Sequence, residues 1–446
     1  MKFRKAKVLA LLLTVALNVS LVSCASSGSG NDSNTAGTGS AGTDSGAVTI
    51  NLMMSNSQET GVSAAVDAFN KAYEGKIYCN ADYVAFDDVF ETLEVLMSNK
   101  SQEYDVFAAD GPNVAAYVHR GYLQPLDQWF SDDETSQFSK AMQTECTYED
   151  HLYGAPLGNS STVMYYNTAL LKQAGLTIDF DAVTQENRLT WEDLVDYSKQ
   201  ALQVLDPDGT KGIFGVEFQQ VGRVYQMNIL PNSLGGAQIG EGGLSIDGVL
   251  NSDAWLTALK FYQQEVNDGV FSRGISADDT SSYFQSGKIL FYLGTTALPA
   301  AFEKNNFTDY GDTYIPCFEG HEDEVATACG SWTLGMNVYS QKQEAAAEFI
   351  KYMTLYDGAD EYISASGMVP AMDRQFTDDL LEEKPYLKIA QYEVNNTAVV
   401  RAITPAYNEY STAVNALWDN VRNGADINTA VQDCIDELNT AFKTYQ

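Results

Sequence analysis

Apolar and polar positions follow two different periods along the first part of the chain after residue 47. Residues 48–52 alternate between apolar and polar side chains, which predicts a strand that ends in a polar loop. Apolar side chains at three- and four-residue steps over residues 62–73 predict a helix. The same patterns predict a strand over residues 81–86, a helix over residues 88–99 and a strand over residues 105–109. This succession is typical of an α/β layer with a parallel sheet.

A second group of predicted elements begins near residue 152. It contains a strand over residues 162–166, a helix over residues 190–204, a glycine-rich turn at Gly235-Gly236 and a strand over residues 289–294. Strand-like segments over residues 314–316 and 330–337 precede a helix over residues 342–356, and the chain ends with helices over residues 412–421 and 427–445. We therefore predict a second α/β lobe.

The N-terminal segment has the pattern of an export signal. Four basic residues precede an apolar run over residues 8–17, which is shorter than the roughly 20 residues of a membrane span. Leu21-Val22-Ser23-Cys24 resembles a lipobox, so we expect a lipoprotein signal peptide over residues 1–23 and acyl chains on Cys24. An ordinary secretory signal is the alternative. Residues 24–46 are rich in Ser, Gly and Thr and predict a flexible tether on the order of 25 Å long.

Charge and cysteine content narrow the choice of partners. The formal net charge of −34 argues against binding to nucleic acid or to an anionic lipid surface. Five cysteines remain besides Cys24, so at least one is unpaired. Cys317 and Cys329 are the best candidates for a disulfide, with buried free thiols as the alternative. No zinc-type spacing occurs among the Cys and the three His residues, and we expect no metal or cofactor.

Short motifs occur in a fixed order along the chain after residue 103. They lie at residues 104–107 and 121–126, 152–156 and 165–167, 189–194, 284–288, 330–336 followed by 345–353, 367–371 and 401–410. Together they resemble the sugar-type extracellular solute-binding proteins of bacterial ABC importers, the family that includes maltose-binding protein. The resemblance covers nearly all of the chain after the tether.

The resemblance implies a two-lobed, periplasmic-binding-protein-like (type II) fold with three interlobe crossovers and a ligand cleft. It places the crossovers near residues 156–162, 314–318 and 363–367. Lobe one is then expected over residues 47–157 plus 316–364, and lobe two over residues 158–315 plus 365–446. The implied function is that of a monomeric, lipid-anchored receptor at the outer face of the cytoplasmic membrane. It captures a mono- or oligosaccharide and delivers it to an ABC permease, without enzymatic turnover.

A saccharide site needs aromatic plates for the sugar ring and planar polar groups for its hydroxyls. Trp332 and Tyr225 are the aromatic candidates, with a core position or a helix face as their alternatives. The polar candidates are Ser55, Gln58, Asp110, Tyr166, Asn167, Thr295 and Arg401. Asp110 and Arg401 offer an acceptor and a donor fork, although Asp110 could instead cap a helix. Thr295 falls where maltose-binding protein carries a stacking Trp, which favours a smaller or different saccharide.

Three other classes of protein fit parts of the sequence. A secreted glycoside hydrolase needs only two carboxylates, but the chain contains no nucleophile elbow, phosphate loop or His pair for a metal. A peptide or polyamine receptor of the same fold would have a cleft dominated by carboxylates. Adjacent Tyr165 and Tyr166 resemble the tyrosine pair of some ferric-binding proteins, but alternation along a strand directs them to opposite faces.

Overall fold

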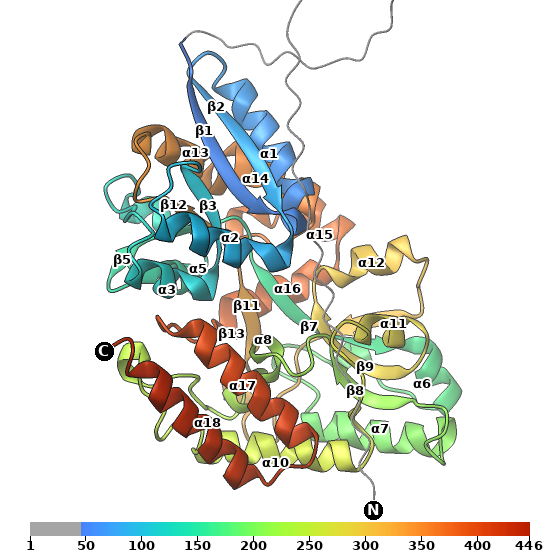
Figure 1. Cartoon of the computed structure of the whole chain (residues 1–446). Helices are drawn as coiled ribbons and strands as arrows, with labels where there is room; N and C mark the ends of the chain where they lie inside the picture. Colours follow the sequence, from blue (N-terminus) through green and yellow to red (C-terminus); the bar gives the residue numbers. More distant parts are fainter. Residues whose placement is uncertain (1–45) are drawn as a thin grey trace, which may run out of the picture. The chain divides into compact units, whose positions relative to one another are not determined.

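The computed structural model describes residues 46–446, apart from the side chains of residues 86 and 87. The predicted signal peptide, Cys24 and all of the tether except residue 46 lie outside the described residues. Within the described part of the chain, two β-sheets are covered by helices on both faces (Figure 1), which confirms the predicted α/β class. No helix of residues 46–446 combines the length and the apolar character needed to cross a membrane.

The first sheet and its helices form lobe one. Its strands, in spatial order, are β2 (Ile77–Val84), β1 (Val48–Ser55), β3 (Val106–Asp110), β12 (Trp332–Met336) and β6 (Gly154–Pro156). β1 runs parallel to β2 and β3, as predicted, whereas β12 is antiparallel to both of its neighbours. β2 begins four residues earlier than the pattern predicted.

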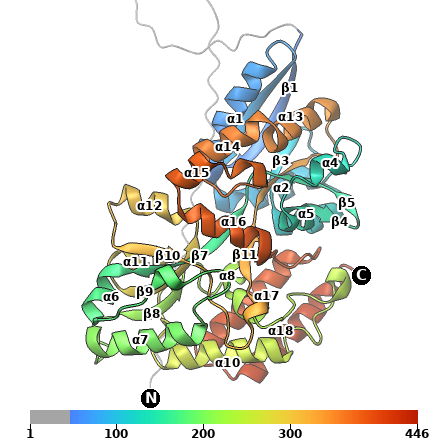
Figure 2. The same ribbon diagram turned by 180° about the vertical axis from the view of Figure 1, so that it is seen from behind.

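Alternating side chains of β1 reach the two cores of lobe one. Leu52 packs in a core with α1 (Glu59–Ala72), α13 (Gln343–Leu355) and α14 (Asp357–Ser366), which lie side by side in Figure 2. Met53 packs on the other face with α2 (Phe86–Ser98) and α3 (Val114–His119). The period-two alternation of the sequence therefore corresponds to a sheet covered on both faces.

Smaller elements of this part of the chain are α4 (Asp132–Thr135), α5 (Lys140–Cys146), β4 (Thr147–Tyr148) and β5 (His151–Leu152).

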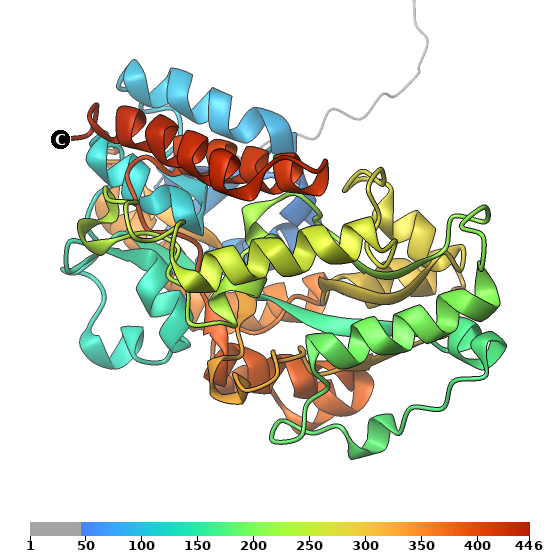
Figure 3. The same cartoon turned by 90° about the horizontal axis from the view of Figure 1, so that it is seen from below.

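The second sheet and its helices form lobe two. Its strands are β13 (Ala398–Val399), β11 (Thr327–Gly330), β7 (Ser160–Asn167), β9 (Ile289–Thr295) and β8 (Phe214–Phe218) in that order, and β10 (Tyr310–Thr313) also pairs with β7. One face packs on α7 (Trp191–Leu205), α10 (Asp253–Asn267), α17 (Tyr407–Arg422) and α18 (Ile427–Phe442), of which the last three contact one another (Figure 3). α11 (Thr280–Gln285) and α12 (Leu298–Lys304) cover the opposite face. Further helices are α6 (Thr168–Ala174), α8 (Val224–Met227), α9 (Ile229–Asn232), α15 (Asp378–Glu383) and α16 (Tyr386–Asn396).

The chain passes between the two sheets at short connections. It leaves the first sheet after Pro156 and enters the second at Ser160. It returns at Ser331, the single residue between β11 and β12. The chain passes to the second lobe again between α14 and α16. α14 packs on α1 of lobe one, whereas α16 packs on β7 and β11 of the second sheet.

The predicted position of the second crossover, residues 314–318, is wrong. β11 follows that segment and still pairs with β7 and β13 of the second sheet. The sequence pattern over residues 330–337 predicts a single strand, whereas Gly330 ends β11 in the second sheet and residues 332–336 form β12 in the first. A hydrophobic pattern records burial and not the sheet to which a residue belongs. The residue limits of the two lobes otherwise stay a prediction.

Five cysteines of the described residues, including Cys317 and Cys329, are free and buried. The suggested disulfide between these two residues is therefore not present. Cys329 is enclosed in the core of lobe one, and the Cys317 thiol lies 3.8 Å from the carbonyl oxygen of Leu189. Both behave as small apolar side chains.

Candidate functional site

A pocket of about 220 Å³ is lined by residues of both lobes. The lining residues are Gln58, Asp110, Ser160, Gln220, Arg223, Tyr225, Thr295, Gly330, Ser331, Trp332, Met368 and Arg401. Six of the nine residues predicted from the sequence are among them, namely Gln58, Asp110, Tyr225, Thr295, Trp332 and Arg401. Their chain positions span more than 300 residues, so only the two-lobed fold brings them together.

Asp110 and Arg401 join the two lobes at the pocket. Asp110 ends β3 of lobe one, and Arg401 follows β13 of lobe two. The guanidinium donates from Nη1 and Nη2 to the two carboxylate oxygens of Asp110, at 2.8 and 2.6 Å. Such a two-pronged contact fixes both groups in one plane. The alternative role of Asp110 as a helix cap is wrong, because its side chain accepts no bond from the following turn.

Two aromatic side chains face the same pocket. Trp332 is half-buried at the start of β12 and stacks on Phe90, with ring centroids 6.2 Å apart. Tyr225 is the second residue of α8, and the centre of its ring lies 5.4 Å from the guanidinium carbon of Arg401. Burial raises the pKa of Tyr225, so the ring remains neutral and available for stacking. An aromatic side chain therefore lines the pocket from each lobe.

Hydroxyl and amide groups complete the polar lining. The Ser160 hydroxyl donates to the carbonyl oxygen of Gly330 at 3.0 Å and lies 2.7 Å from the Tyr225 hydroxyl. The Gln58 amide oxygen accepts from Tyr362 at 2.6 Å, which fixes the orientation of that amide. The backbone N–H of Thr295 donates to the Gln219 side chain at 2.7 Å. These bonds hold the polar side chains in place before a ligand arrives.

Three predicted residues lie outside the pocket lining. Ser55 is fully buried and bonds with Ser57 in the turn after β1. Asn167 is buried and caps α6 by accepting from the backbone N–H of Leu170 at 2.9 Å. Tyr166 stacks on Phe180, with centroids 3.6 Å apart, and lines a different pocket. Each side chain already serves a local structural role.

Sequence reasoning did not identify half of the pocket lining. Gly330 and Ser331 adjoin Trp332, so their position in the motif over residues 330–336 was an available signal. Ser160, Gln220, Arg223 and Met368 lie in segments whose composition is ordinary for a loop or strand start. Arg223 is exposed, with its guanidinium 3.6 Å from Asp278. Only the fold places these four at the pocket.

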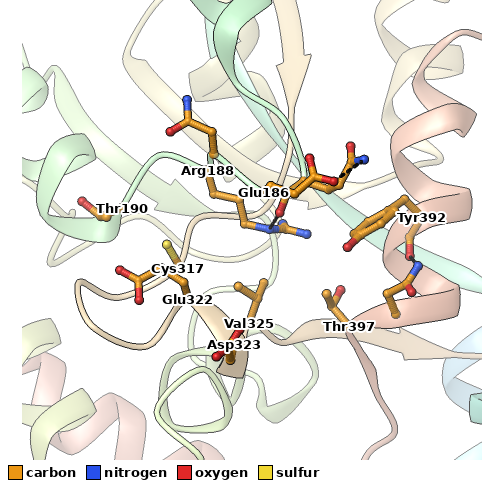
Figure 4. A pocket seen from close by; sticks show the side chains of 12 residues that line it. Glu186, Arg188, Thr190, Cys317, Glu322, Asp323, Val325, Tyr392 and Thr397 are labelled. Carbon is orange, nitrogen blue, oxygen red and sulfur yellow. Dashed lines mark hydrogen bonds between the residues drawn. The ribbon is translucent and has the colours of Figure 1, made fainter.

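A larger hollow of about 520 Å³ lies within lobe two (Figure 4). Residues 185–190, residues 317–325 and the end of α16 line it. Its central cation, Arg188, is 4% exposed and donates to both carboxylate oxygens of Glu393 at 2.7 and 3.2 Å. The guanidinium also lies over the rings of Tyr314 and Tyr392. Because this charge is fully engaged within lobe two, the smaller interlobe pocket is the candidate ligand site.

Comparison with known proteins agrees with this geometry. The bacterial extracellular solute-binding protein family matches residues 64–388. The galactooligosaccharide-binding protein of Bacillus subtilis is 22% identical over 377 residues, which are 82% of this chain and 83% of that protein. The maltodextrin-binding protein of the same organism is 22% identical over 361 residues, or 80% of this chain and 82% of that protein. A relative from Brucella abortus is 23% identical over 176 residues and is matched over only 39% of its own length.

Solved structures share the fold. The GacH receptor of Streptomyces glaucescens, studied unliganded and with acarbose, is 17% identical with a TM-score of 0.73, over 90% of this chain and 100% of that one. A substrate-binding protein of Listeria monocytogenes in complex with cycloalternan is 20% identical with a TM-score of 0.74, over 89% and 99%. The chain belongs to the bacterial extracellular solute-binding protein family and has its two-lobed fold.

Proposed function

We propose that this protein captures a neutral saccharide in the interlobe pocket and delivers it, as a monomer, to an ABC permease. The observation that carries the proposal is the lining of the pocket. Trp332 and Tyr225 offer ring faces from the two lobes, and Asp110 and Arg401 offer fixed acceptors and donors for hydroxyl groups. Relatives named for galactooligosaccharides and maltodextrins support a carbohydrate.

The volume of the pocket bears on ligand size. At about 220 Å³ the pocket is smaller than the roughly 300–1,000 Å³ that is common for ligand pockets, which favours a small saccharide. A longer glycan would extend out of the pocket past Arg223, which is exposed. We therefore expect contacts to be concentrated on a terminal or single saccharide unit.

A thermal-shift screen of residues 47–446 tests the proposal. The panel contains D-galactose, D-tagatose, galactotriose and maltotetraose, with amino acids, spermidine and ferric citrate as non-sugar arms. A ligand at one hundred times its dissociation constant adds about 2.7 kcal/mol, which raises the melting temperature by a few degrees. A shift confined to saccharides supports the proposal, whereas a shift only with amines, amino acids or iron contradicts it.

Catalysis is tested in the same samples. Asp110 is bound to Arg401, and Glu145, whose carboxyl group also lies beside Arg401, is not among the residues that line the pocket. We therefore expect no release of reducing sugar from galactotriose or maltotetraose during prolonged incubation with the protein. Time-dependent release that is proportional to protein concentration would replace the receptor function with a hydrolase.

Membrane attachment forms a second part of the proposal. The lipobox residues 21–24 support lipidation of Cys24 at the outer face of the cytoplasmic membrane. In cells fed labelled palmitate, the wild type and the tether variant Ser26→Ala should carry label in the membrane fraction. Cys24→Ser should carry none. Label that persists in Cys24→Ser contradicts the anchor.

A further inference from the structure

Three ionisable side chains lie together next to the interlobe pocket. Arg401 comes from lobe two, whereas Asp110 and Glu145 come from lobe one. Glu145 lies on α5, whose Ala141 and Met142 belong to the core of lobe one. The Glu145 side chain is 1% exposed, and its Oε1 lies 3.6 Å from Nη2 of Arg401. Within residues 46–446 neither of its oxygens has a hydrogen-bond partner of good geometry, although the Arg401 guanidinium and the backbone N–H of Ser331 lie close enough to oppose the rise of its pKa.

Glycines from both lobes leave room for this cluster. A Cβ on Gly111 of lobe one would overlap the carboxyl group of Glu145. A Cβ on Gly330 of lobe two would lie 2.7 Å from Nη2 of Arg401 and 3.4 Å from Oε1 of Glu145. The carboxyl group and the guanidinium therefore occupy a space that exists only where the backbones of both lobes lack side chains.

The cluster contains one cation for two carboxylates. Burial raises the pKa of Glu145 from 4.5 to about 8, with Arg401 opposing the shift and Asp110 adding to it. The other titratable groups that interact with Glu145 are two thiols and two phenols, Cys146, Cys329, Tyr225 and Tyr407. Burial raises the pKa of each of these four groups, so all four are neutral at pH 7. In this arrangement Glu145 keeps its proton at neutral pH.

We propose that Glu145 is a positioning residue that takes up a proton when the two lobes come together, so that saccharide capture is coupled to proton uptake next to the pocket. The inference rests on the proposed function, since capture in a two-lobed receptor includes closure of the lobes. When Arg401 moves away with lobe two, water reaches Glu145 and removes the burial that holds the proton. When the lobes meet, a neutral Glu145 does not disturb the ion pair between Arg401 and Asp110. An ionised Glu145 would compete with Asp110 for the guanidinium of Arg401.

The sign of the pH dependence follows from linkage. The pKa of Glu145 is about 8 in the structure, where Gly330 and Arg401 of lobe two lie against its carboxyl group. In the proposal, exposure to water with the lobes apart returns this pKa toward its ordinary value of 4.5. Between these two values only the closed form holds the proton. Saccharide affinity should therefore fall as pH rises through this window and should become constant above pH 8.

Isothermal titration calorimetry from pH 5.5 to 9 tests the coupling, with galactotriose, maltotetraose, D-galactose and D-tagatose as probes. We expect wild-type affinity to fall about tenfold per pH unit up to pH 7.5, with about one proton taken up per saccharide in buffers of different ionisation heat. Glu145→Gln, which mimics the neutral form, should show no slope and no proton uptake. Glu217→Gln is the matched control, because Glu217 is also buried with a pKa raised by burial, to about 7, but lies in the core of lobe two beside Arg422.

The outcomes separate the two proposals. Saccharide binding that is independent of pH in the wild type, or that has the same slope in Glu145→Gln, overturns the coupling and leaves the receptor function standing. The proton count of the wild type decides the question even where Glu145→Gln does not fold. Failure of every saccharide to bind at any pH removes the receptor function and the coupling with it.

Discussion

Trp332 stands directly opposite Asp110 in the register of β12 and β3. An aromatic face and a carboxylate that is fixed by Arg401 are thus neighbours across two strands. A sugar ring that stacks on the indole has its hydroxyl groups at its own edge. We expect these hydroxyls to bond with the polar side chains that line the pocket. We therefore expect saccharide recognition to depend most on this cross-strand pair.

Trp332→Ala should weaken saccharide binding by about 1–3 kcal/mol, because it removes the stacking surface on lobe one. Trp332→Phe should retain most of the affinity. Calorimetric dissociation constants measure the effect, and Trp129→Ala, outside the pocket lining, is the control for loss of a partly buried Trp in lobe one. Equal affinity of wild type and Trp332→Ala would place the ligand elsewhere.

The residues that the sequence could reveal are those with a local signature. Asp110 follows a buried strand, and Trp332 lies in a recognisable motif, so both were predictable. Glu145 was not, because a Glu on a short helix ordinarily faces water. Its burial results from Gly111 and Gly330, which are distant in sequence. Asn167 has an equally local signature, but its role is that of a helix cap.

Among the elements, the continuous segment β11–β12 shows how pattern and topology differ. Residues 327–330 pair with β7 in one sheet and residues 332–336 pair with β3 in the other. The pattern over residues 330–337 predicts β12 but not β11, most of which precedes that run, and it leaves the sheet of each strand undetermined. Helices were easier to predict, because α7, α13, α17 and α18 each bury one face and expose another.

The start of α7 offers a prediction about an element. Thr190 and Asp193 form a reciprocal cap, with the Thr190 hydroxyl accepting from the Asp193 N–H at 2.9 Å and the carboxylate accepting from the Thr190 N–H. Thr190→Ala should lower the free energy of unfolding by about 0.5–2 kcal/mol without changing saccharide affinity. Urea denaturation measures the change. Thr444→Ala, at an exposed position near the C-terminus, should have no measurable effect, and equal stability of the two variants would contradict the role of the cap.

Stability of the folded body should depend on pH through Glu145 and Glu217, the fully buried carboxyl groups of residues 46–446 whose pKa values are raised. Burial raises the pKa of Glu145 to about 8 and that of Glu217 to about 7. Protons bound in the folded state stabilise it below the unfolded pKa of 4.5, and this stabilisation is lost as pH rises through 7 and 8. The melting temperature should therefore fall between pH 5.5 and 8.5, a range in which ordinary carboxylates are already ionised.

Differential scanning calorimetry of the saccharide-saturated protein measures this trend, because the proposed coupling keeps Glu145 buried only when the lobes are together. Glu217→Gln should reduce the slope of melting temperature against pH, because it removes one of the two titrating groups. The substitution keeps an acceptor for the Ser272 hydroxyl, which now donates to Glu217. A melting temperature that rises over this range in the wild type would contradict the assignment.

The two-lobed architecture was predictable from the order of strands, helices and motifs, while the contacts between lobes were not. Local patterns report which side of a strand or helix is buried. Contacts such as Asp110 with Arg401 depend on where the chain changes sheets, which is a property of the complete fold. The same limit explains the missed Ser160, which begins β7 immediately after a crossover.

The single residue between β11 and β12 also determines where movement can be detected. When the two lobes rotate against each other, strands at the far edges, β2 in one sheet and β8 in the other, travel further than residues nearer the joint. A pair of fluorescent dyes on those edge strands would therefore change its separation the most when the pocket fills. The edge strands β2 and β8 are therefore the best attachment points for the dyes of a saccharide biosensor.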